Sequence, residues 1–386
     1  MGEVLHVRLP VYLDYNATTP VDPDVVVEMQ PYFTQNFGNP SSAHAYGEQA
    51  KDAVDWSRTR VATLLGCAPG EVIFTGGGSE SNNLAIKGIA FANQGRGRHI
   101  ITSTVEHPAV LNTCRYLEAR HGYTVTFVPV DETGRVDPGD VERAVRPDTI
   151  LITIMMANNE TGTLQPIAEI GAIARRLRIP FHTDAAQAVG KVPVNVETLQ
   201  VDLLTVAGHK LYAPKGIGAL YVRRGTVLDS LIHGAGHEGG LRAGTENVPY
   251  MVGLGKACAI AGAHLPEEST RLSGLRDQLF ADLRARINNI HFNGHPTERL
   301  PNTLNVSFRG IPGYELLSNV REVAASTGSA CHAGVAAPSP VLREMGVPDE
   351  IATGAVRLSL GRWTTKEEIA LASEWLVNGV LHGRRP

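Results

Sequence analysis

The stretch "PFHTDAAQAVGKVPVNVETLQVDLLTVAGHK", residues 180–210, decides the fold predicted for this chain. It contains two short apolar runs, and each ends on polar residues: Asp184 and Gln187 after the first, His209 and Lys210 after the second. Almost continuous apolar runs of this length are typical of strands that are covered on both faces. Asp184 and Lys210 are separated by a single strand–connection–strand step, so the spacing places them at adjacent strand ends.

The same alternation of apolar runs and helical stretches extends outward from about residue 50 to about residue 260. Repeated strand–helix units predict an α/β domain with a mainly parallel sheet and helices on both of its faces. The predicted strands are the seven segments "EVIF" (71–74), "RHIITS" (98–103), "YTVTFVPV" (123–130), "DTILITI" (148–154), "IPFHTD" (179–184), "VDLLTVA" (201–207) and "GIGALYVRR" (216–224).

The rest of the chain indicates a second, smaller α+β domain. Residues 255–287 read as a long helical connector with an interruption at Pro266, and shorter α+β segments follow it. We therefore expect a boundary near residue 260, with residues 15–260 forming the large domain. Residues 1–14 and 261–386 would form the small domain.

Composition excludes several classes of protein. A formal net charge of -4 without a Lys/Arg run argues against nucleic acid as the main ligand. No apolar run approaches the roughly 20 residues that span a bilayer, and the first residues lack a signal-peptide pattern, so we expect a cytoplasmic protein. The spacing of the cysteines argues against a zinc site, an iron–sulfur cluster and a disulfide framework. The four cysteines are far apart in the sequence: Cys67, Cys114, Cys258 and Cys331.

Polar residues gather at the predicted strand ends, where open α/β sheets bind their ligands. The glycines before Gly78 and Ser79 open a helix and suit an anion, although a plain tight turn remains open and the spacing is not that of a P-loop. His107, Asp184 and Lys210 each have an ordinary alternative, as a buried histidine, a helix N-cap or a solvated lysine. Together with the glycine turn, which can cradle a phosphate, these residues supply an amine, a carboxylate and an aromatic-like ring. These are the parts that hold pyridoxal 5′-phosphate.

Ten sequence blocks, in order from about Tyr12 to Arg362, make the family recognisable. The chain resembles the pyridoxal-phosphate-dependent cysteine desulfurases of the nitrogen-fixation and iron–sulfur-cluster type, in the class V aminotransferase family, and the closely related selenocysteine lyases. The blocks are "YLDYNATTP", "NFGNPSSAHAYG", "FTGGGSESNN", "VEHPAVL", "NNETG", "HTDAAQ", "GHKLYAPKGIGALYVRR", "RAGTEN", "STGSACHAG" and "RLSLGR".

The resemblance implies the fold-type I architecture, a homodimer and a cofactor site. Lys210 matches the lysine that binds the cofactor aldehyde, and Asp184 matches the partner of the pyridine nitrogen. Gln187 matches the neighbour of the phenolic oxygen, and His107 matches the histidine stacked on the ring. The phosphate positions are Gly78, Ser79 and His209, together with Thr245 from the other subunit.

The resemblance also implies the substrate chemistry. Arg357 takes the substrate carboxylate with help from Asn159, which is also a cofactor-binding position, and no metal is involved. Cys331, on a loop of small residues, is the nucleophile that takes sulfur from L-cysteine as a persulfide and leaves L-alanine, with His107 moving a proton near the sulfur. The sulfur then passes to an acceptor protein, either an iron–sulfur scaffold or a thiolation enzyme.

Three other functions stay open: a selenocysteine lyase, an ordinary aminotransferase that leaves Cys331 without a role, and a non-catalytic cofactor-binding protein. The chain departs from the family at Ala207, where many members carry a serine that donates to the phosphate. We therefore expect one cofactor contact to be lost or replaced.

Overall fold

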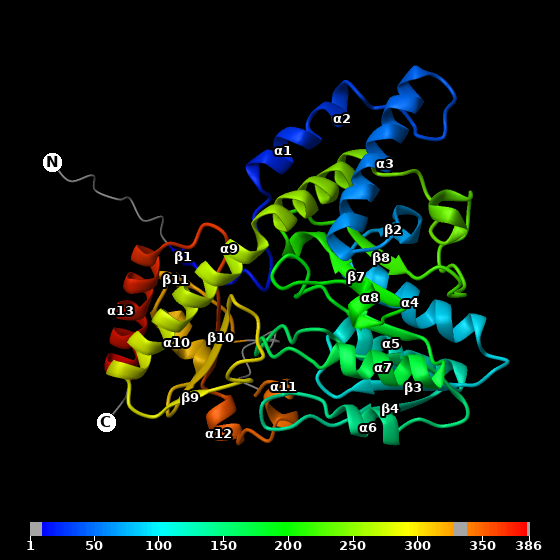
Figure 1. The fold of residues 1–386 in the computed structure, drawn as a ribbon. Helices are drawn as coiled ribbons and strands as arrows, with labels where there is room; N and C mark the ends of the chain where they lie inside the picture. The colour runs from blue at the N-terminus through cyan, green and yellow to red at the C-terminus, as the bar shows by residue number, and fades with distance from the viewer. Residues whose placement is uncertain (1–9, 328–337, 384–386) are drawn as a thin grey trace.

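The computed structural model describes residues 10–327 and 338–383, so Cys331 lies outside the described residues. Within them, seven strands form one sheet in the order β2-β8-β7-β6-β5-β3-β4 (Figure 1). All adjacent strands from β7 to β4 pair in parallel, and β8 is antiparallel to both of its neighbours. The predicted mainly parallel sheet is confirmed, and its strands are β2 (Val72–Thr75), β3 (His99–Ser103), β4 (Thr124–Val128), β5 (Thr149–Thr153), β6 (Phe181–Asp184), β7 (Leu203–Ala207) and β8 (Gly218–Val222).

Successive side chains of each strand enter two different cores, because side chains alternate between the faces of a sheet. In β2, Val72 and Phe74 join the core on one face, whereas Ile73 joins the core on the other. The first face is covered by α3 (Ala45–Leu65), α7 (Ile167–Leu177) and the first half of α9 (Val248–Arg286). The second face is covered by α4 (Gly78–Ala92) and α5 (Pro108–His121).

Helix α9 continues through Pro266, so the predicted interruption at this residue is wrong. Proline removes one intrahelical hydrogen bond and strains the preceding turn. Here the two halves of the helix are held by separate cores. Leu254 packs in the core on the first face of the large sheet, while Leu275 and Leu283 pack in a further core outside that sheet. Packing on both sides of the proline therefore keeps one helical axis running across the molecule (Figure 1).

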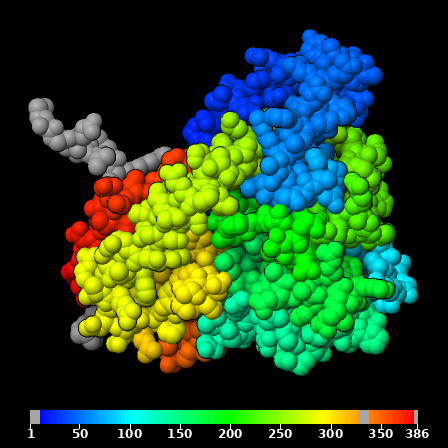
Figure 2. Space-filling model, in the orientation of Figure 1, coloured from blue at the N-terminus to red at the C-terminus, as the bar shows by residue number. Residues whose placement is uncertain are grey.

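This further core, which contains Leu275 and Leu283, belongs to an α+β unit around an antiparallel sheet, β12-β10-β9. Figure 2 shows this unit in yellow to red against the green and cyan of the large sheet. Val11 and Leu13 pack in the same core although they come from the start of the chain. This distribution supports the expected division into two domains near residue 260, which we retain as a proposal.

The elements of this unit are β1 (Val11–Tyr12), β9 (Ile290–Phe292), β10 (Thr303–Phe308), β11 (Val323–Ala324), β12 (Ala355–Ser359), α10 (Gly313–Asn319), α11 (Pro340–Glu344), α12 (Asp349–Ala352) and α13 (Lys366–Gly383). The remaining short helices are α1 (Pro23–Met29), α2 (Pro31–Thr34), α6 (Pro138–Arg143), α8 (Val196–Leu199) and the 3₁₀ turns η1 (Pro69–Glu71), η2 (Gly208–Lys210) and η3 (His237–Gly240). Across the described ranges, no helix has the length and apolar character needed to cross a membrane.

Candidate active site

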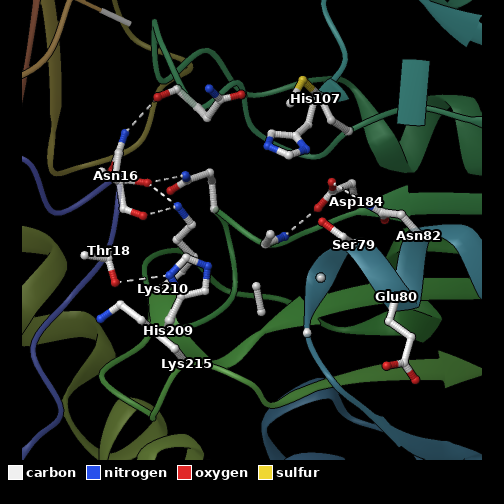
Figure 3. A pocket seen from close by; sticks show the side chains of 18 of the residues that line it. Asn16, Thr18, Ser79, Glu80, Asn82, His107, Asp184, His209, Lys210 and Lys215 are labelled. Atoms are coloured by element: carbon white, nitrogen blue, oxygen red, sulfur yellow. Dashed lines mark hydrogen bonds between the residues drawn. The ribbon is translucent and has the colours of Figure 1, made fainter. Parts of the chain in front are cut away.

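A cavity of about 620 Å³ opens at the ends of the strands where the sequence places its polar residues. Of the predicted site residues, the cavity walls contain Gly78, Ser79, His107, Asn159, Asp184, Gln187, His209, Lys210 and Arg357. Thr245 is exposed and does not line the cavity, and Cys331 lies outside the described residues. Figure 3 shows labelled side chains from distant parts of the chain, such as Asn16, His107, Asp184 and Lys210, around this space.

The rim of the cavity carries an uncapped helix N-terminus. The chain leaves β2 through Gly76 and Gly77 and enters α4 at Gly78; Gly77 has φ +143° and supplies no side-chain cap. The first amides of a helix lack partners within the helix and carry its positive dipole end, so this turn can bind an anion. The turn also packs closely, since a Cβ on Gly78 would lie 3.2 Å from that of Ala207.

Asp184 ends β6 on the cavity floor and is 5% exposed. Its Oδ2 accepts a hydrogen bond of 2.7 Å from Asn82 Nδ2, and its Oδ1 accepts one of 3.0 Å from the amide of Ala186. Two donors thus fix the carboxylate plane while each oxygen keeps a further lone pair for a ligand. The arrangement suits a protonated ring nitrogen.

His107 is the N-cap of α5, and its ring points into the cavity (Figure 3). Burial lowers its pKa, an effect that Asp184 opposes and Lys210 reinforces. Nδ1 accepts a hydrogen bond of 3.1 Å from the amide of Ala109, so the proton of the neutral ring resides on Nε2. The side chain can therefore present a flat neutral ring with one N–H donor.

Lys210 follows β7 in the turn η2, and its Nζ donates to the carbonyl oxygens of Asn16 and Ala17. Burial, followed by the positive charge of Arg357, lowers the pKa of this amine to about 8. The neighbouring His209 bonds through Nδ1 to Thr18 Oγ1 at 3.2 Å, and burial lowers its pKa to about 4. An amine with a pKa near neutrality can act as a nucleophile and as a base.

Arg357 reaches the cavity from β12 of the small domain and is 5% exposed. One Nη donates to the carbonyl oxygen of Asn159 at 3.0 Å, and the other pairs with Asp14 at 2.8 Å. Its Nε is buried, and no residue in the described ranges accepts a hydrogen bond from it. The guanidinium is therefore held in place with a donor to spare for a carboxylate.

Three functional candidates escaped the sequence reasoning: Asn16, Asn82 and Lys191. The main-chain oxygen of Asn16 accepts from Lys210 and from Gln187, so this residue lies at the centre of the site (Figure 3). Asn16 and Asn82 both lie inside quoted sequence blocks, and Lys191 lies four residues beyond Gln187. This proximity in the sequence was the available signal, but the fold decides which of these side chains meet.

The described cysteines are poor candidates for a reactive thiol. Cys114 and Cys258 are buried, and Cys67 is half-buried. Burial raises the pKa of Cys67 and of Cys258 to about 12 and also raises that of Cys114. Since the thiolate is the nucleophile, these side chains remain inert at neutral pH.

Comparison with known proteins gives matches over nearly the whole chain. Residues 11–371 match the family described as "Aminotransferase class-V". The chain is 53% identical to the protein named cysteine desulfurase IscS from Methanosarcina thermophila, over 93% of this chain and 89% of that one. It is 49% identical to the protein of the same name from Dictyoglomus turgidum, over 93% and 91%.

Solved structures show the same relationship. The fold is similar to that of a NifS-like protein, with a TM-score of 0.91 and 38% identity over 97% of this chain and all of the other. It is also similar to SspA in complex with cysteine, with a TM-score of 0.81 and 42% identity over 92% of this chain and 99% of the other.

Proposed function

The chain belongs to the class-V aminotransferase family and is a pyridoxal-phosphate-dependent cysteine desulfurase, and from this premise we propose how its residues act. One observation supports the proposal most: a single cavity unites an anion cradle, a buried carboxylate, a lysine amine and a guanidinium. We propose that L-cysteine is converted to L-alanine in this cavity, with its sulfur passing to Cys331.

The residues present fit the cofactor. The uncapped N-terminus of α4 at Gly78 and Ser79, with His209, would take the phosphate. Asp184 would pair with the ring nitrogen, and the face of His107 would cover the ring. When bound, the cofactor supplies an aldehyde that holds amines and a conjugated ring that accepts electrons from the substrate Cα.

Lys210 would anchor the cofactor and then move a proton. Its lowered pKa leaves an appreciable neutral fraction at neutral pH, so Nζ can accept the Cα proton of the substrate. Before the cofactor is attached, the two carbonyl oxygens that accept from Nζ hold the amine at the cavity wall. His107 Nε2–H is the group that can donate near the substrate sulfur.

Arg357 would bind the substrate carboxylate. Among the residues that the structure describes, none accepts from its buried Nε, and its charge is balanced by Asp14, which is 21% exposed in its side chain. A carboxylate that approaches this fork would compete with Asp14 for the guanidinium. Asn159, whose carbonyl oxygen already holds Arg357, lines the same wall.

Cys331 would attack the substrate sulfur as a thiolate. A sulfur–sulfur bond forms while the carbon–sulfur bond breaks, and the electron pair of the broken bond stays with carbon, which is protonated to give alanine. The raised pKa values of Cys67, Cys114 and Cys258 support this choice among the four cysteines. The names of the relatives favour cysteine over selenocysteine as the substrate.

We also propose a homodimer. Large apolar side chains are exposed on α1, α2, the loop that follows α2, and α3, which form the blue end of the molecule in Figure 1. They are Val27 on α1, Phe33 on α2, Phe37 in the loop, and Tyr46 and Trp56 on α3. An exposed patch of this kind is typical of an interface. The persulfide sulfur would pass to an acceptor protein, an iron–sulfur scaffold or a thiolation enzyme, in the cytoplasm.

Replacing Cys331 tests the proposal. Cys331→Ser protein should bind cofactor and change its absorption on addition of L-cysteine, yet release no alanine, because a serine hydroxyl is barely ionised and cannot hold sulfur as a persulfide. Cys67→Ser protein, the control, should form alanine normally. Mass spectrometry of wild-type peptides after L-cysteine should find the extra sulfur on Cys331 alone. Wild-type alanine release by the serine variant would refute the assignment.

A further inference from the structure

Lys191 is a buried lysine beside the cavity that the proposed chemistry leaves unused. It is 9% exposed and lies four residues after Gln187, in the turns that follow β6. Its Nζ donates to Gln187 Oε1 at 2.7 Å and to Asn16 Oδ1 at 3.4 Å. The amine therefore contacts two amide oxygens, both of residues that line the cavity.

The surroundings of Lys191 disfavour its charged form. Burial lowers its pKa well below the usual value for lysine, and the positive charges of Lys210 and Arg357 lower it further. The amine donates hydrogen bonds in either protonation state, so Lys191 can hold the amide oxygens that it contacts.

These contacts fix the orientation of the Gln187 amide. Oε1 faces the amine of Lys191, and Nε2 donates to the main-chain oxygen of Asn16 at 2.9 Å. Turning the amide over would move Oε1 away from the N–H groups of Lys191 and place it against the main-chain oxygen of Asn16, so both observed hydrogen bonds would be lost. Nε2 carries a second hydrogen, and Gln187 forms part of the cavity wall.

We propose that Lys191 is a positioning residue, which holds Gln187 so that Nε2 donates into the cavity to the phenolic oxygen of the bound cofactor. The inference rests on the cofactor site proposed above. A fixed donor at this oxygen favours its anionic form. Lys191 therefore tunes the protonation equilibrium of the bound cofactor through Gln187.

The test is a pH titration of the absorption of the bound cofactor, without substrate. In Lys191→Met the amide of Gln187 loses its fixed orientation, so the midpoint should move up by about 0.5–1 pH unit, as expected when a hydrogen bond to the charged form is lost. A cavity of about 20 Å³ next to Lys191 and Lys210 gives the methionine room. Lys256→Met on α9, remote from the cavity, is the control and should leave the midpoint unchanged.

A double-mutant cycle separates positioning from a direct effect. Gln187→Ala should move the midpoint upward by itself, and adding Lys191→Met to it should cause no further shift. Lys191→Gln, which keeps an amide donor, should shift the midpoint less than Lys191→Met and serves if the latter does not fold. Thermal unfolding checks that each variant is native.

Three results would overturn the inference. Additive shifts in the double variant would mean that Lys191 acts independently of Gln187. If the midpoint shifts in Gln187→Ala but not in Lys191→Met, Lys191 does not position Gln187, although the contact of Gln187 with the cofactor stands. If Gln187→Ala itself leaves the midpoint unchanged, the proposed contact of Gln187 with the phenolic oxygen fails, and the inference fails with it.

Discussion

At the scale of single residues, burial sets the protonation of the basic groups around the cavity. It is the largest cause of the lowered pKa of Lys210, His209 and Lys191. Each of these groups loses hydration that its charged form needs, and neighbouring cations add to the effect. Arg357 pairs with Asp14, so the site combines a guanidinium for the substrate with basic groups whose charged forms are disfavoured.

The pKa of Lys210 predicts how cofactor attachment depends on pH. The neutral amine is the nucleophile, and the pKa is lowered from 10.5 to about 8, so attachment should accelerate as pH rises through about 8 and then level off. The measurement is borohydride-trapped pyridoxal phosphate on Lys210 of cofactor-free protein, located by peptide mapping. Arg357→Met removes a nearby positive charge, so its curve should shift to higher pH. A wild-type midpoint near 10.5 would contradict this account.

The charge of Asp184 predicts a slow variant that still binds cofactor. Asp184→Asn keeps the size of the side chain but removes the negative charge next to the ring nitrogen. We expect alanine formation to fall by about three orders of magnitude, roughly 4 kcal/mol of transition-state stabilisation, with cofactor content retained. Single-turnover alanine release measures it, and a loss below tenfold would exclude the proposed pairing.

At the scale of elements, the anion cradle depends on how β2 joins α4. Gly77 lies at φ +143°, where L-residues rarely occur, and an added Cβ there would meet no atom within 4 Å. A side chain at this position would therefore be disfavoured by the backbone conformation and not by a steric clash with neighbouring atoms.

Gly77→Ala should lower the free energy of unfolding by about 1–3 kcal/mol and weaken cofactor binding, because the turn must shift away from the helix N-terminus. Gly70→Ala is the control: a Cβ there also meets nothing within 4 Å, and its φ is outside the strained range. Chemical denaturation and cofactor titration measure both effects. Equal results for the two variants would show that the geometry of the turn is unimportant.

Helix α9 offers a second element-scale prediction. Pro266 is exposed and costs the helix one hydrogen bond. Pro266→Ala should raise the free energy of unfolding by about 1–2 kcal/mol, since part of the helical gain is offset by a more flexible unfolded chain. Denaturant unfolding checks this, with alanine formation expected at the wild-type rate. A loss of stability would mean that the proline makes contacts that support α9.

At the scale of the whole molecule, Asn16 joins the α+β unit to the ends of the large sheet, the two parts that we propose to be separate domains. Its side chain donates to Thr303 Oγ1 at 2.9 Å, while its main-chain oxygen accepts from Gln187 and Lys210. Arg357 crosses in the opposite direction, from β12 to Asn159. The site therefore exists only when both domains are packed together.

The proposed homodimer predicts complementation between inactive subunits. Each site would use its own Lys210 and the partner's Thr245, which is exposed and outside its own cavity. Lys210→Ala and Thr245→Ala proteins should each be impaired, and mixed dimers should regain one intact site, about half the wild-type activity per dimer. Differently tagged subunits purified after co-expression allow the measurement. Mixed dimers no more active than the separate variants would refute a shared site.

The sequence by itself determined the sheet and most of the candidate site. Alternating apolar runs predict the parallel strands, and their polar ends place Asp184 and Lys210 at one edge, because parallel strands bring their carboxyl ends together. The tertiary structure alone decided the continuity of α9 through Pro266, which depends on packing from two cores. It also decided the partners of Asn16 and Lys191. Hydrogen bonds between residues far apart in the chain depend on how distant segments pack together, and the local periodicity of apolar residues does not predict them.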